Sequence, residues 1–297
     1  MKLKFNVMRE AQPDPFIFKD GDKFYIYVTG KTGVEAYSTT DVFGIWQYEG
    51  VVTDIEGTDF WAPSVIKLDD KYYMYVSFVR GEKREFLHVA SADSPLGPFK
   101  NEKLLYDYFS IDSHVVKTDK GLFLWYAKNS YEGDRIGTRV FVDRLIDPYT
   151  VENNPIEKII PTFDEEIYTP AYKDDYRWHT IEGPFWFQKG EYQYLMYSGG
   201  CYEDDTYHIG YSVAKTTDGD LTKVTYKKVV LDGKFNPVLI KNDEEEGTGH
   251  HSVIKIDDEY YAFYHARDYG VPQGKELRTA RICRLIVGDG IIKAERL

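Results

Sequence analysis

A strand–turn–strand pattern recurs along this chain and limits its fold more than any other sequence feature. In each copy an apolar run, a tight polar turn and a Tyr- or Phe-rich run follow one another, as expected for a β-hairpin. The second run begins ten residues after a reference position, which we call position zero. The five copies have Asp14, Ala62, Asp112, Glu182 and His250 at this position.

The spacing of the copies predicts the architecture. Position zero recurs at intervals of 48, 50, 70 and 68 residues, further strand-like runs follow in every copy, and helical periodicity is almost absent. A repeat near fifty residues with about four strands is the signature of a β-propeller. The sequence therefore predicts an all-β protein, a single five-bladed β-propeller domain over residues 1–297. Residues 249–297 can form a complete last blade without an N-terminal strand, and the longer intervals predict insertions, one of them including residues 161–179.

Charge and composition argue against several kinds of partner. The net charge is -12, with 37 Lys and Arg against 49 Asp and Glu, which repels a phosphate backbone, so we expect no nucleic-acid partner. No run approaches a membrane-spanning length, and the N-terminal residues lack the apolar core of a signal peptide. The two cysteines, Cys201 and Cys283, lie far apart, which favours a reducing compartment. We therefore expect a cytoplasmic protein without a membrane partner.

Position zero begins the innermost strand of each predicted blade, so its occupants should meet at one mouth of the central channel. Three of them, Asp14, Asp112 and Glu182, are carboxylic acids. Each alone is as readily a turn or cap residue, but three acids at one register form a like-charge cluster that costs stability unless it is used. Hydrolysis of a glycosidic bond needs one protonated and one ionised carboxyl group. The cluster and its aromatic-rich surroundings indicate a sugar-processing site, without showing which acid has which role.

The motifs around position zero resemble those of glycoside hydrolase family 43 over residues 12–290. The matching segments occur in the family's order: Asp14-Pro15-Phe16, Trp61-Ala62-Pro63, Ser94-Pro95-Leu96-Gly97-Pro98-Phe99, Ser110-Ile111-Asp112, Glu182-Gly183-Pro184 and Gly249-His250. The resemblance implies inverting hydrolysis of arabinofuranosides or xylosides. By analogy Asp14 would be the general base that activates water, and Glu182 the general acid. Asp112 would raise the pKa of Glu182 and orient it. An inverting site would hold the carboxyl groups of Asp14 and Glu182 roughly 6.5–9.5 Å apart.

The predicted substrate-binding set is Trp61, Ala62, Gly183, His250 and Arg278, and all of these except Arg278 lie in the matching motifs. Trp61 would pack beside the sugar, with a core tryptophan between blades as the alternative. Gly183 would let the sugar approach closely because it has no side chain. Arg278 would reach a sugar hydroxyl or Glu182, or else form a surface ion pair.

Three histidines lie in the last predicted blade. His250 matches the family's axial histidine, which would help to hold a channel cation such as calcium through water, with a satisfied core histidine as the alternative. No cofactor is expected to be required. His251 and His265 are expected to be structural.

The main functional prediction is an exo-acting α-L-arabinofuranosidase that cleaves arabinose- or xylose-containing oligosaccharides. A β-xylosidase or an endo-arabinanase of the same family is the alternative within the class. A non-catalytic carbohydrate-binding propeller would repeat its binding residues in every blade, whereas position zero differs between the copies. A glycoside phosphorylase would need a cluster of Arg, Lys and His for phosphate, and the sequence offers only Arg278 and the histidines.

Overall fold

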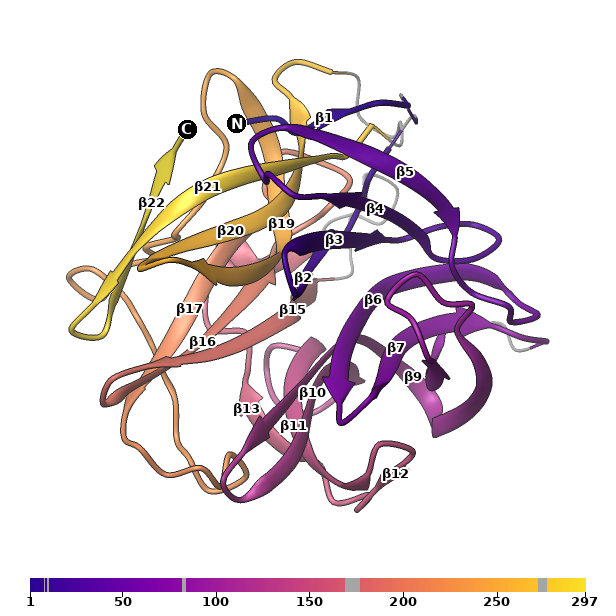
Figure 1. Ribbon diagram of the computed structural model, residues 1–297. Helices are drawn as coiled ribbons and strands as arrows, with labels where there is room; N and C mark the ends of the chain where they lie inside the picture. Colours follow the sequence, from indigo (N-terminus) through magenta and orange to yellow (C-terminus); the bar gives the residue numbers. More distant parts are fainter. Residues whose placement is uncertain (8, 10, 82–83, 169–176, 272–276) are drawn as a thin grey trace.

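The computed structural model describes residues 1–7, 9, 11–81, 84–168, 177–271 and 277–297. These residues are mostly β-strand, which confirms the all-β prediction (Figure 1). The strands are β1 (Lys4–Phe5), β2 (Phe16–Asp20), β3 (Lys23–Val28), β4 (Glu35–Thr39), β5 (Ile45–Val51), β6 (Thr58–Leu68), β7 (Lys71–Val79), β8 (Phe86–Ala92), β9 (Lys100–Thr118), β10 (Gly121–Ser130), β11 (Gly137–Asp147), β12 (Thr150–Val151), β13 (Ile156–Ile159), β14 (Ile167–Tyr168), β15 (Trp178–Lys189), β16 (Tyr192–Gly199), β17 (His208–Lys215), β18 (Lys227–Lys228), β19 (Glu245–Ile256), β20 (Glu259–Asp268), β21 (Thr279–Gly288) and β22 (Ile291–Arg296).

Helical structure is confined, within the described ranges, to the 3-10 turn η1 (Asp164–Glu166). No helix there has the length and hydropathy that crossing a bilayer requires.

The hairpins expected from the repeat are present and antiparallel: β2–β3, β6–β7, β9–β10, β15–β16 and β19–β20. We call each hairpin, with the strands that follow it, a unit, and number the units 1 to 5 in chain order. In every unit a residue with left-handed backbone stands just before or within the first strand. These residues are Asp14, Ala62, Asp112, Gly183 and His250, with φ between 44° and 62°.

This conformation corrects the sequence alignment in unit 4, where Gly183 and not Glu182 occupies position zero. The left-handed residue lies nine residues before the first paired residue of the second strand, which is Lys23 in unit 1 and Tyr192 in unit 4. The alignment took the first aromatic residue as the start of that strand. In unit 4 the aromatic residue itself closes the turn, opposite Lys189, so the register slipped by one residue.

In the corrected register, Glu182 aligns with different residues of the other units. Glu182 stands directly before position zero, as Pro13, Trp61 and Ile111 do in units 1 to 3, and these four residues line the same pocket. A one-residue shift on a strand turns a side chain to the other face. Gly183 is therefore the ring residue of unit 4. Glu182 precedes it by one residue and lines the pocket above the ring.

Two long strands connect neighbouring units into larger sheets. The first part of β9 pairs with β8, and its second part pairs with β10. β11 also pairs in parallel with β15 over two residues. Hydrogen bonding consequently joins the middle of the chain into a 13-stranded sheet, between a five-stranded sheet (β1–β5) and a four-stranded sheet (β19–β22).

The first strands of the five units contact one another in a closed cycle. β2 contacts β6, β6 contacts β9, β9 contacts β15, β15 contacts β19, and β19 contacts β2. Figure 1 shows β2, β15 and β19 near the centre of the molecule, with β5, β12 and β22 at its periphery. This cycle brings the position-zero residues together from distant parts of the chain.

The chain ends meet in unit 5. All four strands of its sheet come from residues 245–296, as expected. The N-terminal segment adds to it, since Leu3 N–H donates to the carbonyl of Ala280 at 3.0 Å and Ile282 N–H donates to the carbonyl of Met1 at 2.9 Å.

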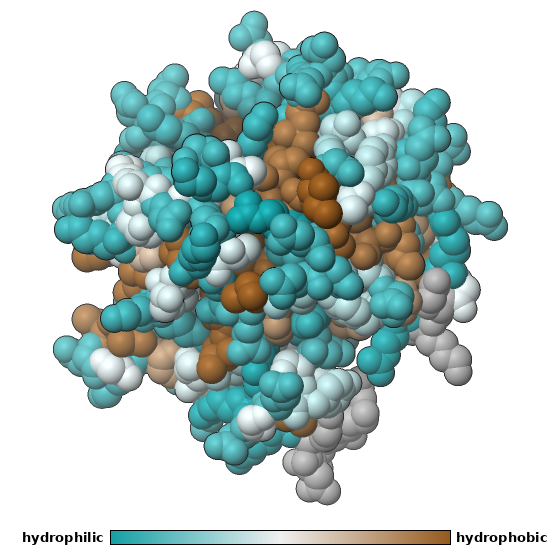
Figure 2. Space-filling model, turned by 90° about the horizontal axis from the view of Figure 1, so that it is seen from below, coloured by the Kyte–Doolittle hydropathy of each residue, from teal (hydrophilic) through white to brown (hydrophobic). Residues whose placement is uncertain are grey.

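Aromatic and aliphatic side chains fill the spaces between neighbouring units. Trp46 of β5 in unit 1 meets Phe263 of β20 in unit 5 edge-on, with ring centroids 6.0 Å apart, and both side chains are fully buried. The face in Figure 2 is mostly hydrophilic, with hydrophobic residues exposed in groups between. Because close-packed interiors have low compressibility, this packing holds the inner strands rigidly around the site.

The predicted insertion at residues 161–179 is described in part. Its first portion contains η1 and β14, and β14 pairs with the start of β15. Tyr172 and Tyr176, which the sequence placed in an aromatic insertion, lie outside the described residues. Glu166 anchors the described portion: it is completely buried and accepts hydrogen bonds from the backbone N–H of Thr162 (2.6 Å) and Phe163 (3.0 Å).

Candidate active site

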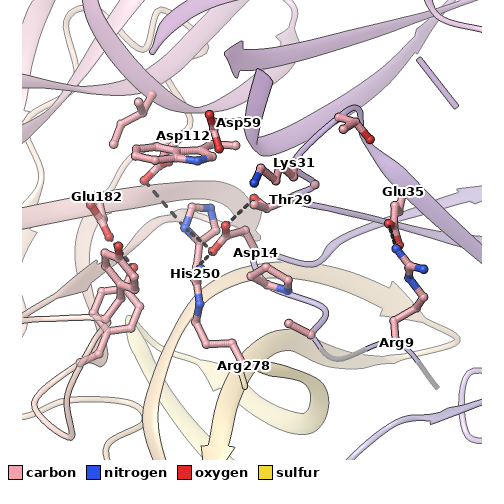
Figure 3. Close-up of a pocket in the computed structure, with 18 residues that line it drawn as sticks. Arg9, Asp14, Thr29, Lys31, Glu35, Asp59, Asp112, Glu182, His250 and Arg278 are labelled. Carbon is pink, nitrogen blue, oxygen red and sulfur yellow. Dashed lines mark hydrogen bonds and ion pairs between the residues drawn. The ribbon is translucent and has the colours of Figure 1, made fainter. Parts of the chain in front are cut away.

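A pocket of about 760 Å³ opens above the ring of position-zero residues. Its floor includes Asp14, Asp112 and His250, and its wall includes Trp61 and Glu182. Figure 3 shows Asp14 and His250 in the middle, Glu182 to one side, and the ion pair of Arg9 with Glu35 at the opposite side. The three carboxylic acids predicted from the repeat therefore share one pocket.

Side chains fifteen residues after position zero fix the ring. Thr29 Oγ1 accepts the N–H of Ala62 at 2.8 Å, Ser198 Oγ accepts the N–H of His250 at 2.8 Å, and His265 Nδ1 accepts the N–H of Asp14 at 3.1 Å. Each bond runs from one unit to the next, so it ties neighbouring inner strands together. Left-handed backbone at non-glycine residues costs free energy, and these bonds compensate for it.

Unit 3 has Ala127 at the corresponding position, which cannot accept a hydrogen bond. Asp112 takes over this role, since its Oδ2 accepts the N–H of Gly183 at 2.9 Å. The same oxygen lies 3.8 Å from Nδ1 of His250. Asp112 is thus tied to the residue that follows Glu182.

Asp14 is held as an ionised carboxylate. Thr29 Oγ1 donates to its Oδ2 at 2.5 Å. Its Oδ1 lies 3.3 Å from Nη1 of Arg278, 3.4 Å from Nδ1 of His250 and 3.1 Å from Nδ1 of His265. Burial favours the neutral form, but His250 and Arg278 outweigh it and hold the pKa of Asp14 well below its usual range.

Glu182 is in the opposite state. Burial raises its pKa to about 7 and the charge of Asp14 adds to the rise, while the hydrogen bond from Tyr207 and the charge of Arg278 oppose it. Burial also raises the pKa of Asp112 well above its usual value, and the carboxyl groups of Glu182 and Asp14 add to that. Near neutral pH the pocket therefore holds one ionised carboxylate beside a carboxylic acid that can donate a proton. Burial, and then the charge of Asp14, account for the raised pKa of Glu182, and the role of Asp112 in raising it stays a prediction.

The structure separates the predicted substrate-binding set into two groups. Trp61, His250 and Arg278 line the pocket. Ala62 and Gly183 instead line a narrow cavity beneath the ring. A sugar in the pocket would accordingly contact Trp61 and Glu182. Gly183 lies below, at the narrow cavity beneath the ring.

Arg278 lies against Asp14, and its guanidinium group stands 4.7 Å from the centre of the Tyr202 ring. This contact differs from the surface ion pair considered from the sequence, because only 12% of the side chain is exposed. His265 was expected to be structural, yet it contacts Asp14 directly. His251 is buried beneath the ring, and neither of its ring nitrogens has a hydrogen-bond partner within the described part of the chain.

Ligand atoms of Asp112, Glu182 and His250 lie within 4.8 Å of one another, the spacing of a metal-binding cluster. Calcium takes six to eight oxygen ligands, and this cluster offers two carboxyl groups and one imidazole. A calcium ion would need most of its ligands from water, and its charge would favour the ionised form of Glu182, which must keep a proton to act as the acid. These three residues fit a directly coordinated calcium ion poorly, so no chemical step is assigned to one. The water-mediated channel cation expected at His250 stays a prediction.

Sequence reasoning missed Thr29, Tyr207 and Tyr202 in the pocket. Thr29 could have been found, since Thr29, Ser77, Ser198 and His265 share the register fifteen residues after position zero. Tyr207 and Tyr202 come from the connection between β16 and β17, and no repeated position marks them.

Comparison with known proteins identifies the family. The model of Glycosyl hydrolases family 43 matches residues 5–290. The chain belongs to this family. A thermostable family-43 glycoside hydrolase of known structure superimposes with a TM-score of 0.82 at 30% identity, covering 96% of this chain and 93% of the other. Sequence and fold thus agree in placing this chain among the family 43 proteins.

Two curated relatives of this family 43 chain are named for their activity. The extracellular exo-alpha-(1->5)-L-arabinofuranosidase of Streptomyces avermitilis is 26% identical over 89% of this chain and 56% of its own length, so the chain spans little more than half of it. The extracellular exo-alpha-(1->5)-L-arabinofuranosidase ArbA of Cellvibrio japonicus is 26% identical over 85% of this chain and 78% of its own. Both names contradict the predicted cytoplasmic location, which was drawn from the N-terminal residues and the cysteines and is wrong.

Proposed function

We propose that this chain is an inverting glycoside hydrolase that releases terminal L-arabinofuranose from arabinan- or arabinoxylan-derived oligosaccharides. The observation that supports it most is the opposite ionisation of two carboxyl groups in one pocket, Asp14 with a lowered pKa and Glu182 with a pKa raised to about 7. Environments that separate two pKa values in this way assign the base and the acid. Asp14 is the general base and Glu182 the general acid.

In the proposed reaction, Asp14 accepts a proton from a water molecule as the water oxygen attacks the anomeric carbon. The bond from that carbon to the leaving oxygen breaks, and Glu182 gives its proton to this oxygen. Thr29 and Arg278 hold the Asp14 carboxylate in place, and Asp112 positions the strand that carries Glu182. The two carboxyl groups supply the acid and the base, so the proposal requires no cofactor.

We further infer that the architecture is a five-bladed β-propeller formed by units 1 to 5. The closed cycle of contacts among β2, β6, β9, β15 and β19 supports it, as do the hydrogen bonds that link position zero of one unit to the preceding unit. One domain over residues 1–297 follows from this arrangement.

The pocket supports an oligosaccharide substrate. Its volume of about 760 Å³ lies in the range that holds a ligand larger than one pentose, and it extends from Glu182 to the pair of Arg9 with Glu35. The activities named for the two curated relatives favour the arabinoside. A β-xylosidase or endo-arabinanase is the alternative in the same class. A non-catalytic binding protein is disfavoured because it would gain nothing from two carboxyl groups held in opposite states.

The test is an assay on an aryl arabinofuranoside and an aryl xyloside with wild type, Glu182→Ala and Asp14→Ala. Removing an essential acid or base costs about 10²–10⁴-fold in rate, and we expect losses of this size with the arabinoside as the better substrate. Near-native activity in both variants would refute the assigned roles. A preference for the xyloside would contradict the proposed substrate but not the roles assigned to Asp14 and Glu182.

A further inference from the structure

Among the described residues, one hydrogen-bond donor reaches the proposed acid, on one of its two oxygens. The hydroxyl group of Tyr207 lies 2.6 Å from Oε1 of Glu182, although the residues are 25 positions apart. Tyr207 is 1% exposed, whereas the Glu182 side chain is partly open to the pocket. The contact therefore joins a fixed, buried phenol to a carboxyl group at the surface of the pocket.

Residues of unit 5 determine where the Tyr207 ring lies. Gly249 stands directly before position zero of that unit, where Glu182 stands in unit 4. A Cβ atom at Gly249 would lie 1.9 Å from Cε1 of Tyr207, so the ring occupies the space that a side chain would take. Thr248 Oγ1 also donates to the carbonyl of Tyr207 at 3.5 Å. The absence of a side chain at Gly249 thus sets the position of the phenol.

The Tyr207 ring also contacts a histidine that lies against Asp14, the proposed base. The Tyr207 ring stacks on His265, with centroids 5.6 Å apart and an interplanar angle of 8°. His265 in turn contacts both the backbone N–H and Oδ1 of Asp14. One buried stack therefore fixes the carboxyl groups of Glu182 and Asp14 relative to each other.

The Tyr207 hydroxyl is a donor throughout the working pH range, because burial first, and then the charge of Glu182, raises its pKa well above its usual value. An oxygen that accepts this O–H bond is a poor site for a proton, since the two hydrogens would face each other. The exchangeable proton of Glu182 must then reside on Oε2.

From this geometry we propose that Tyr207 is a positioning residue, which selects Oε2 of Glu182 as the oxygen that carries the proton to the leaving group. This inference rests on the proposed role of Glu182 as the acid. A purely structural tyrosine would affect all substrates alike. A residue that positions the acid affects a substrate in proportion to its need for a proton.

The experiment compares Tyr207→Phe and Glu182→Ala with wild type on aryl arabinofuranosides whose leaving phenols span a wide range of pKa. Phe keeps the ring, its stack on His265 and the filled space at Gly249. We expect Tyr207→Phe to lose about ten- to a hundredfold in kcat/KM on the poorest leaving group, at the low end of general acid effects, and little on the best. The matched control is Tyr75→Phe, which removes an equally buried hydroxyl that donates to Pro148 at 2.7 Å, away from the pocket.

The pH profile supplies a second readout. The bond from Tyr207 lowers the pKa of Glu182, so its removal stabilises the protonated acid, and the basic limb of kcat/KM should move to higher pH. Should Tyr207→Phe fold poorly, 3-fluorotyrosine at this position keeps the shape and strengthens the donor. It should move the limb to lower pH.

The outcomes separate the inference from the function on which it rests. Two results together would overturn the positioning role, provided that Glu182→Ala still showed steep leaving-group dependence. The first is a loss in Tyr207→Phe that is equal for all leaving groups. The second is a basic limb that does not move, in Tyr207→Phe or with 3-fluorotyrosine. If Glu182→Ala itself showed no such dependence, the assignment of the acid would be wrong.

Discussion

Asp112 accepts the backbone N–H of Gly183 through Oδ2 at 2.9 Å, and so links the inner strand of unit 3 to that of unit 4. The other ring bonds use side chains fifteen residues after position zero, and Ala127 cannot take that part. A buried carboxyl group thereby replaces a hydroxyl or an imidazole. Its position next to the residue that follows Glu182 makes it a support for the proposed acid.

Two replacements of Asp112 should isolate the contribution of its hydrogen bond to Gly183. Asp112→Asn keeps an oxygen that can accept from Gly183, whereas Asp112→Ala leaves that buried N–H without a partner, which costs about 1–3 kcal/mol. We expect Asp112→Ala to be less stable than Asp112→Asn by this amount in urea unfolding, and at least tenfold lower in kcat/KM. Equal stability of the two variants would show that the bond to Gly183 is not what Asp112 contributes.

The pH dependence of the wild type follows from the two carboxyl groups. Glu182 must be protonated to act, and burial raises its pKa to about 7, so kcat/KM should fall as the pH rises through this value. Asp14 must be ionised, and its pKa is held well below the usual range, so little activity should be lost between pH 7 and about 5. A profile of kcat/KM from about pH 4 to 9 measures the basic limb and checks that activity does not fall on the acidic side. A basic limb that persists unchanged in Glu182→Gln would assign it to another group.

Gly183→Ala tests the corrected register. Ala62 adopts the same left-handed conformation at position zero of unit 2, and a Cβ at Gly183 would make ordinary contacts, 3.4 Å to Oγ of Ser198 and 3.6 Å to Cα of His250. The variant should fold, lose about 1–2 kcal/mol because alanine is strained in this region, and keep kcat/KM within a few-fold. A large increase in KM would place Gly183 against the sugar after all.

The buried pair of Glu166 with Lys228 should hold the described part of the insertion. Glu166 is completely buried and the Lys228 side chain is 11% exposed. Glu166→Gln leaves a buried ammonium group without its counter-charge, which costs about 3–5 kcal/mol in unfolding free energy. The control is Glu191→Gln, whose partner Lys215 is 61% exposed and whose loss should cost about 0–1 kcal/mol. Similar losses in both variants, measured by urea unfolding, would mean that Glu166 is no anchor.

The repeat made much of this site predictable. Hairpin spacing depends on local turn chemistry, which the sequence shows directly. The spacing therefore predicted the strands and the ring that contains Asp14, Asp112 and His250. It misplaced Glu182 by one residue, because an aromatic residue marks the start of a strand only to within one position. Thr29 and His265 carried a usable signal in their shared register. Tyr207 carried none, since its approach to Glu182 depends on the space left by Gly249 in another unit.

The configuration of the first product tests the central claim, that Asp14 activates water opposite a proton donated by Glu182. Proton NMR recorded during the first minutes of hydrolysis of an α-L-arabinofuranoside shows which anomer forms before mutarotation. The account predicts that β-L-arabinofuranose appears first. Initial formation of the α anomer would show that configuration is retained, and would contradict the role of Asp14 as the base that activates water.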